Sequence, residues 1–159
     1  MNRPARALTA AAPPVVAAAV GATAARNAPE IYARLDKPSW APPAGVFGPV
    51  WSALYLLIGA TGWRLAERPR RVATALHLVQ LGLNASWTPL FFGAGRRRAA
   101  LAVSIALDVT VAAEMAQLVR DGDRPAAALL APYLAWCGFA TALTASVGDP
   151  QPAGEDTAA

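Results

Sequence analysis

The chain has 159 residues, of which 55% are hydrophobic and 15% are charged, and its formal net charge is +4 at pH 7. Charged residues make up roughly a quarter of an ordinary soluble domain, so this composition excludes one and indicates a single-domain integral membrane protein. The arginines lie in short clusters between apolar runs, where membrane proteins place them in loops, so the positive charge does not indicate nucleic-acid binding.

The first apolar run covers residues 8–25 and follows an N-terminal segment of residues 1–7. Pro13 and Pro14 lie near its start, where a helix tolerates proline best. A secretory signal peptide is the alternative interpretation, because arginines precede the run and an Ala-Thr-Ala sequence near its end resembles a cleavage site. Small residues at every fourth position from Ala17 favour instead a membrane helix that packs closely against another helix.

Residues 26–45 form a proline-rich connector that carries Tyr32 and Trp40. Each X-Pro bond pushes the preceding residue towards extended geometry, so the repeated prolines predict a stiff loop rather than a continuous helix. Pro29 can still begin a short helix that runs to Leu35. We interpret this connector as a lid over a pocket inside the membrane domain.

The second apolar run, residues 46–65, carries an aromatic face. Trp51, Tyr55, Gly59 and Gly62 recur at helical spacing, so they share one side of the predicted helix. The face has large aromatic side chains at one end and glycines at the other. At the glycine end we predict either a hollow or a close contact with another helix.

The third run, residues 72–92, carries a polar stripe of His77, Gln80, Asn84 and Trp87 at helical spacing. Polar groups are costly against lipid, so this stripe is expected to face the interior of a helix bundle. Pocket lining and hydrogen bonding between helices are the two roles that the amides suit, and one does not exclude the other.

The fourth run, residues 99–119, has Asp108 near its centre, where a carboxylate needs a partner, a proton or water. A structural hydrogen bond to a neighbouring helix is the favoured role. Glu114 is expected to reach the membrane interface, so no function is assigned to it. The fifth run, residues 125–147, places Trp136 on one face with other aromatic and small residues. The remaining residues, 148–159, predict a disordered acidic tail.

His77 is the only histidine and Cys137 the only cysteine, and no Walker, GxSxG or HExxH motif is present. Zinc sites and hydrolytic triads need more groups than these, so we predict no metal and no required cofactor. His77 can also ligate a haem iron, as an alternative to a hydrogen bond inside the bundle. Tryptophan, tyrosine and a few amides suit a large, flat, mostly apolar ligand.

Five motifs occur in order: K-P-S-W-A-P-P at 37–43, F-G-P-V-W at 47–51, Q-L-G-L-N at 80–84, W-T-P-L-F-F-G at 87–93 and P-Y-L-A-W-C-G-F-A at 132–140. Together they resemble the tryptophan-rich sensory protein family, also called the translocator protein or peripheral-type benzodiazepine receptor family. The resemblance covers about residues 28–147. It implies an all-α bundle of five transmembrane helices that forms a homodimer, with a ligand pocket under the first inter-helix loop.

The resemblance also implies binding of a porphyrin such as protoporphyrin IX or haem. The family's pocket residues correspond to Tyr32, Trp40, Trp51, Tyr55, Asn84, Trp87, Trp136 and Ala140. Many relatives have a tyrosine where this chain has His77, which we add to the ligand-binding candidates because it shares the stripe of Asn84. No Lys or Arg follows Tyr133, so the cholesterol pattern proposed for this helix is absent.

We therefore predict a porphyrin-binding sensor or regulatory protein in a bacterial cell membrane, with lipid and a second copy as partners and no nucleic acid. One alternative is a light-dependent porphyrin-degrading enzyme in which Trp51 and Trp136 serve as oxidisable groups. Another is a tetrapyrrole or lipid transporter, against which the lack of a visible internal repeat argues. Lys and Arg are divided almost evenly between the two sets of loops, so the orientation is not fixed.

Overall fold

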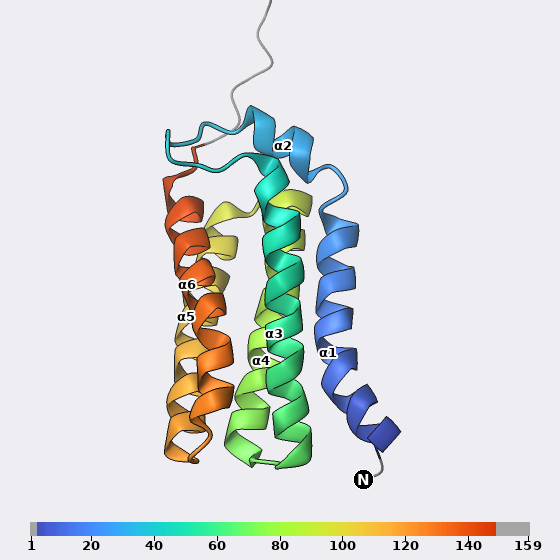
Figure 1. The fold of residues 1–159 in the computed structure, drawn as a ribbon. Helices are drawn as coiled ribbons and strands as arrows, with labels where there is room; N and C mark the ends of the chain where they lie inside the picture. The colour runs from blue at the N-terminus through green and yellow to red at the C-terminus, as the bar shows by residue number, and fades with distance from the viewer. Residues whose placement is uncertain (1–2, 149–159) are drawn as a thin grey trace, which may run out of the picture.

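The computed structural model describes residues 3–148, and within them the chain has six α-helices and no strand (Figure 1). Of the predicted tail, only Gly148 lies among the described residues. The elements in chain order are α1 (Arg3–Ala24), α2 (Ala28–Arg34), the 3-10 turn η1 (Ala44–Val46), α3 (Phe47–Glu67), α4 (Arg71–Thr88), the π-helical turn η2 (Pro89–Gly93), α5 (Arg97–Arg120) and α6 (Arg124–Ser146).

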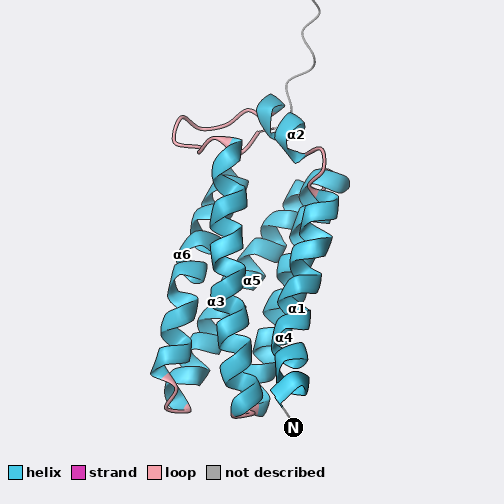
Figure 2. Cartoon of the chain, turned by 45° about the vertical axis from the view of Figure 1, so that its right-hand side comes forward, coloured by secondary structure: helices cyan, strands magenta, loops and turns pink. Residues whose placement is uncertain are grey.

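Five long helices run side by side, and α2 lies across one end of them (Figures 1 and 2). Around the bundle the order is α1, α3, α6, α5, α4, and α4 returns to pack on α1. The consecutive helices α3 and α4 make few contacts with each other. We call the end that carries α2 the lid end, and the other end, where the chain enters α1, the opposite end.

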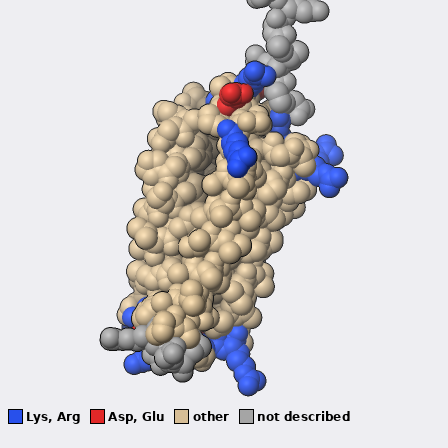
Figure 3. Space-filling model, turned by 90° about the vertical axis from the view of Figure 1, so that its right-hand side faces the viewer, with Lys and Arg blue, Asp and Glu red and all other residues tan. Residues whose placement is uncertain are grey.

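Among residues 3–148, four segments are long and apolar enough to cross a membrane: Ala7–Ala24, Ala44–Glu67, Arg97–Arg120 and Arg124–Ser146. On the face shown in Figure 3, Lys and Arg gather at the two ends of the bundle and leave a wide uncharged band between them. This distribution is typical of a multi-pass membrane protein, with basic residues at the headgroups and apolar residues against the lipid chains.

The helix α4 runs alongside these segments but is not among them. His77, Gln80 and Asn84 lower its hydropathy, yet all three are buried, while Leu78 and Val79 are exposed. Its polar residues therefore face the bundle and its apolar residues face outward, as the predicted stripe requires.

The helix α1 begins at Arg3, so Pro13 and Pro14 lie in its interior rather than near its start as predicted. Neither proline has an N–H, so the carbonyl of Ala10 lacks the donors three and four residues ahead that a helix normally supplies. Ala10 and Ala17 are buried where α1 packs on α3 and α4. This packing favours the membrane-helix interpretation of α1 over the signal peptide.

Gly62 allows α1 to approach α3 closely. A Cβ atom at Gly62 would lie 3.1 Å from the Ala10 carbonyl oxygen and 3.2 Å from His77 Nε2. At Gly59, one turn earlier, a Cβ would meet no atom within 4 Å. The sequence left open whether these glycines mark a hollow or a close helix contact. Gly62 marks a close helix contact, and Gly59 marks open space.

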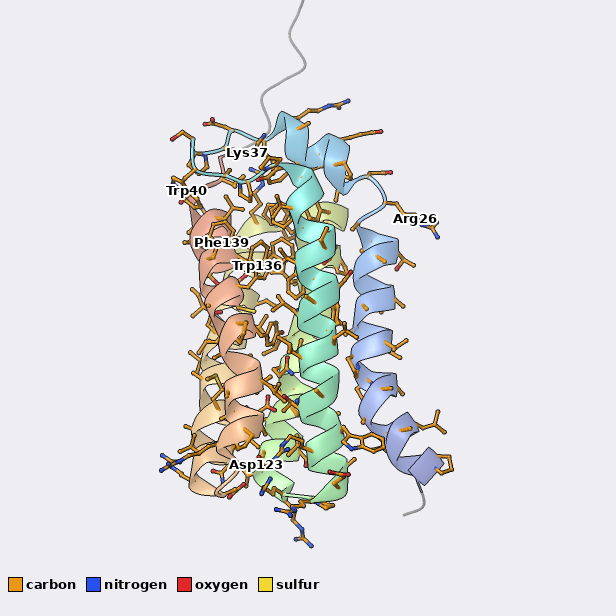
Figure 4. The ribbon with its side chains drawn as sticks, in the orientation of Figure 1. Arg26, Lys37, Trp40, Asp123, Trp136 and Phe139 are labelled. Atoms are coloured by element: carbon orange, nitrogen blue, oxygen red, sulfur yellow. The ribbon has the colours of Figure 1, made fainter. Side chains whose placement is uncertain are left out.

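At the opposite end, where Figure 4 labels it, Asp123 connects α3, the residue before α4 and the first turn of α6. Its carboxylate accepts hydrogen bonds from Arg64 Nη2 at 2.7 Å and from Arg70 Nη1 at 2.8 Å, and from the Ala126 amide in the first turn of α6 at 3.2 Å. Burial alone raises the pKa of the Asp123 carboxyl, but the hydrogen bonds from the two guanidiniums and the amide outweigh it and lower the pKa to about 2. Gly122, with φ of 77°, makes the turn that presents this carboxylate.

Candidate functional site

The lid, residues 26–45, is held in shape by Lys37 at the end of α2. Its ammonium group donates to the carbonyl oxygens of Tyr32, Ala33 and Leu35 at 2.6, 3.2 and 2.9 Å. The last carbonyls of a helix lack backbone donors, and a cation there also interacts favourably with the helix dipole. The same ammonium lies 5.0 Å from the centroid of the Tyr32 ring.

Two further contacts fold the lid and fasten it. The buried Tyr32 hydroxyl donates to the carbonyl of Pro42 at 2.8 Å, and burial raises the pKa of this hydroxyl. The Gly148 amide donates to the carbonyl of Asp36 at 3.0 Å. The Arg97 guanidinium in turn donates to the Gly148 carbonyl. The lid is therefore connected to the ends of both α5 and α6.

Two rings of the lid and three rings beneath it form a continuous row, which we call the aromatic row. Figure 4 labels three of its members, Trp40, Phe139 and Trp136. Neighbouring ring centroids are 5.4 Å apart for Tyr32–Phe47, 5.9 Å for Phe47–Trp136, 5.2 Å for Trp136–Phe139 and 5.8 Å for Phe139–Trp40. Three of these pairs meet edge to face, an arrangement that aromatic rings favour. The row thus joins the lid to α3 and α6.

Below the row, hydrogen bonds link α3, α4 and α6 in a chain of polar side chains, which we call the polar chain. The Tyr55 hydroxyl donates to Asn84 Oδ1 at 2.7 Å, Asn84 Nδ2 donates to the Tyr133 hydroxyl at 3.2 Å, and that hydroxyl donates to Gln80 Oε1 at 3.0 Å. Trp51 covers this chain, with its ring 5.6 Å from that of Tyr55 and 6.2 Å from that of Tyr133. The side-chain amides of Asn84 and Gln80 therefore connect α4 to α3 and α6, on the side of the aromatic row that faces away from the lid.

Trp87 lies on the other side of the same region, at the end of α4. Its ring stacks on Phe91 at 4.8 Å and meets Phe92 edge to face at 5.9 Å. Pro89 cannot donate a backbone hydrogen bond, and the chain continues from it as the π-helical turn that carries both phenylalanines. Trp87 packs in one apolar cluster with Tyr32 and other lid residues.

Ala140 is half-buried on α6, one turn beyond Trp136, and its carbonyl accepts a hydrogen bond from the Thr144 hydroxyl at 2.7 Å. The indole N–H groups of Trp87 and Trp136 are buried, and neither has a hydrogen-bond partner among the described residues. Two donors are thus left unpaired in the region under the lid.

His77, which we added to the ligand-binding candidates, lies away from the region under the lid. It lies seven residues before Asn84, which is about 10 Å along the helix axis. Its Nδ1 is 2.8 Å from Glu114 Oε1, so its partner is on α5. The periodicity of α4 places His77 on the correct side of the helix but at a depth below the aromatic residues.

Glu114 is fully buried, which contradicts the expectation that it reaches the membrane interface. A signal was present in the sequence, because Leu107, Val111 and Leu118 share its helical face and form the buried side of α5. Asp108 has the interhelical partner that was favoured for it: the Thr141 hydroxyl of α6 donates to its Oδ2 at 2.7 Å.

Three residues near the site were not among the predicted ligand contacts. Tyr133 is the centre of the polar chain, and Phe47 and Phe139 belong to the aromatic row. The sequence carried a signal for each of them: Tyr133 and Phe139 lie within the fifth motif, and Phe47 lies within the second.

The opposite end of the bundle has a shallow surface cavity of about 310 Å³, lined by Arg70, Arg71, Val72, Gln117 and Asp121. Its charged walls do not suit a large apolar ligand. Under the lid, by contrast, the aromatic rings contact one another, so a guest there has to displace rings or the lid as it enters.

Replacing Lys37 by methionine is expected to loosen the lid, because three carbonyls lose a charged donor. With a loss of about 1 kcal/mol in the free energy of local opening, amide hydrogen exchange in residues 33–37 should rise about fivefold. Arg34→Met, which removes a positive charge from the same lid, is the matched control and should leave exchange nearly unchanged. Equal exchange rates in the two variants would show that Lys37 does not stabilise the lid.

Comparison with known proteins gives concordant matches. A model of the TspO/MBR family matches residues 9–148. The chain is 40% identical to the tryptophan-rich sensory protein of Cereibacter sphaeroides over 131 residues, which is 79% of this chain and 82% of that protein. It is 34% identical to protein CrtK of Rhodobacter capsulatus over 139 residues, 84% of this chain and 86% of that one. It is also 39% identical to the translocator protein of Ovis aries over 118 residues, 70% of this chain and 69% of that one.

Proposed function

This chain belongs to the TspO/MBR family of membrane proteins, and from that premise we propose that it is a sensor that binds a tetrapyrrole under its lid. The ligand class is a porphyrin such as protoporphyrin IX or haem. Trp51 and Trp136 flank the macrocycle, and the lid carrying Tyr32 and Trp40 controls its entry. The name of one relative, tryptophan-rich sensory protein, is consistent with such a role.

The unpaired indole N–H groups of Trp87 and Trp136 are the observation that supports this proposal most directly. Buried donors normally have acceptors, so two orphaned donors beside a row of aromatic rings indicate a guest with both a π-face and acceptor groups. A porphyrin offers a flat face for the rings and propionate oxygens for donors. His77 lies too deep to reach the same guest, so we assign it no haem-ligating role.

We further propose that α4 crosses the membrane together with the four apolar segments, which gives five crossings. Its outward residues are apolar and its polar residues are turned into the bundle. A homodimer in a bacterial cell membrane is proposed on the family resemblance. Gly62 and Ala17 pack inside one chain, so they do not supply the dimer surface.

The double variant Trp51→Phe/Trp136→Phe tests porphyrin binding in detergent. Loss of two large contact surfaces should raise the apparent Kd for protoporphyrin IX about tenfold or more, as expected for aromatic anchors of a binding site. The shift of the porphyrin absorbance band on binding is the measurement, because it does not depend on the number of tryptophans that remain.

Trp63→Phe is the matched control, since Trp63 lies near the other end of α3, away from the lid. It should bind porphyrin like the wild type. An unchanged Kd in the double variant would exclude this site for the ligand.

Light-dependent breakdown of the bound porphyrin is the second candidate function. The observation that favours it is that Trp136, an oxidisable side chain, lies within the aromatic row under the lid. Illumination of the complex should then give a defined product that Trp136→Phe fails to form. The same bleached mixture as free porphyrin gives would exclude an enzymatic role.

A further inference from the structure

A second polar centre lies deep in the bundle, away from the aromatic row. His77 Nδ1 and Glu114 Oε1 are 2.8 Å apart, and their side chains are only 5% and 0% exposed. The second atom of each group, His77 Nε2 and Glu114 Oε2, has no hydrogen-bond partner among the described residues. Binding of a porphyrin under the lid does not require this pair, so it calls for another explanation.

One more side-chain atom on this face of α4 is unpaired, and a backbone carbonyl of α1 lies close to the imidazole. Gln80 Nε2 is fully buried, has no partner among the described residues, and lies one helical turn from His77 on the same face of α4. The Ala10 carbonyl is deprived of its usual helical donors by the two prolines that follow it. The missing side chain of Gly62 leaves a point that is 3.1 Å from this carbonyl oxygen and 3.2 Å from His77 Nε2. The carbonyl and the imidazole therefore both lie at the close helix contact that Gly62 allows.

The hydrogen-bonding character of these atoms favours an added proton. The carbonyl of Ala10 and Glu114 Oε2 are acceptors, and His77 Nε2 is one whenever Nδ1 donates its proton to Glu114. Gln80 Nε2 supplies a single donor group. A proton added at His77 Nε2 turns that atom into a donor on the side of the Ala10 carbonyl.

The charges around the pair favour an added proton over any other cation. Glu114 contacts His77 from α5, the Tyr133 hydroxyl of α6 donates to the neighbouring Gln80, and Arg64 of α3 is bound to Asp123. Among the described side chains, His77 is the basic group in contact with the Glu114 carboxylate.

We propose that His77 and Glu114 form a proton-binding site that is linked to ligand binding under the lid. The proton comes from the aqueous phase and is shared within the pair. The link is the polar chain, because Gln80 is both the end of that chain and the neighbour of His77. Nothing in porphyrin binding itself supplies this site.

The polar chain can transmit a signal because its direction can reverse. In the structure each group donates towards Gln80, so Tyr55 presents lone pairs to the region under the lid and Gln80 presents its N–H groups to the pair. Rotation of both amides reverses every bond, so that Tyr55 donates to the ligand and Gln80 turns its oxygen towards His77.

This reversal fixes the sign of the linkage. A ligand with acceptor groups, such as a carboxylate, favours donation by Tyr55, and the oxygen that Gln80 then turns inward stabilises protonated His77. Binding of such a ligand is therefore accompanied by proton uptake. Linkage is reciprocal, so protonation of the pair strengthens ligand binding by the same factor, about tenfold within the usual range for coupled sites. This part rests on the proposed function.

The site can be tested without any ligand, because His77 is the only histidine in the chain. In ¹⁵N-histidine-labelled protein without added histidines, the two ring nitrogen signals report the protonation of this residue alone. We expect protonation at Nε2 as the pH falls, and at least a tenfold lower proton affinity in Glu114→Gln, which keeps the shape but removes the negative charge. Equal titration midpoints in wild type and Glu114→Gln would overturn the proton site.

Addition of protoporphyrin IX at the titration midpoint tests the link. The protonated His77 signal should increase in the wild type and in Thr61→Val, a buried control whose hydroxyl bonds only within its own helix. It should stay unchanged in Gln80→Leu, which cuts the polar chain and leaves both titrating groups in place. An equal increase in Gln80→Leu would overturn the link. Failure of the porphyrin band to shift would overturn the proposed function and the link, while the ligand-free titration still decides the proton site.

Discussion

Replacing Gly62 by valine is expected to lower the free energy of unfolding by about 3 kcal/mol, the upper part of the usual range for overpacking. The first carbon added there would lie 3.1 Å from the carbonyl oxygen of Ala10. That atom belongs to the backbone of α1, so it can retreat only if the whole helix moves away from α3. Reversible unfolding in detergent micelles, followed by circular dichroism, measures the change.

Gly59→Val is the matched control, because it lies on the same helix and a Cβ there meets no atom within 4 Å. Its effect should stay within about 1 kcal/mol, in the range set by helix propensity alone. If the two valine variants are equally stable, Gly62 has no special part in the contact between α1 and α3.

Asp123→Ala is expected to destabilise the protein by about 2–4 kcal/mol. The substitution leaves the guanidiniums of Arg64 and Arg70 without their shared carboxylate and removes the cap of α6. Arg64 is partly exposed and can be rehydrated, which keeps the effect below that of a fully buried pair. Asp121→Ala, in the same turn but with a looser contact of 3.8 Å to Arg70, should cost much less.

The same carboxylate predicts a dependence of stability on pH. Its pKa is lowered in the folded protein from 3.8 to about 2, so its contribution is fully present above pH 4. As the pH falls from 4 towards 2, the folded protein has to bind a proton that the unfolded chain binds more readily, and the contribution is lost. Asp123→Asn should therefore show a smaller loss of stability over this interval than the wild type. Parallel curves for the two proteins would contradict the assignment.

Local rules account for the parts of the site that the sequence predicted. The X-Pro bonds of the connector exclude a long helix, and the structure has only the short α2 and η1 between α1 and α3. The four-residue spacing of Trp51 and Tyr55 places both on one side of α3, where their rings lie 5.6 Å apart. Such features depend on backbone geometry over a few residues, so they can be inferred from one sequence.

Pairings between helices could not be inferred in the same way. His77 and Glu114 are 37 residues apart, and their contact depends on the relative depth and rotation of α4 and α5. Periodicity gives the side of a helix but not its height against a neighbour, which is why His77 was grouped with Asn84 among the ligand-binding candidates. The start of α1 was missed for a related reason: Pro13 and Pro14 suggested the beginning of a helix, whereas tertiary packing carries α1 through them.

The hydrogen bonds of Gly148 place the end of α6 against the lid, on the side of the bundle away from the start of α1. A fluorescent protein or purification handle fused directly after this residue would therefore press on the loop that covers the aromatic row. One fused before α1 would sit across the membrane from it. Measured affinities for a guest are expected to depend on which end carries the fusion, and binding studies of this protein are best made with the C-terminal end free.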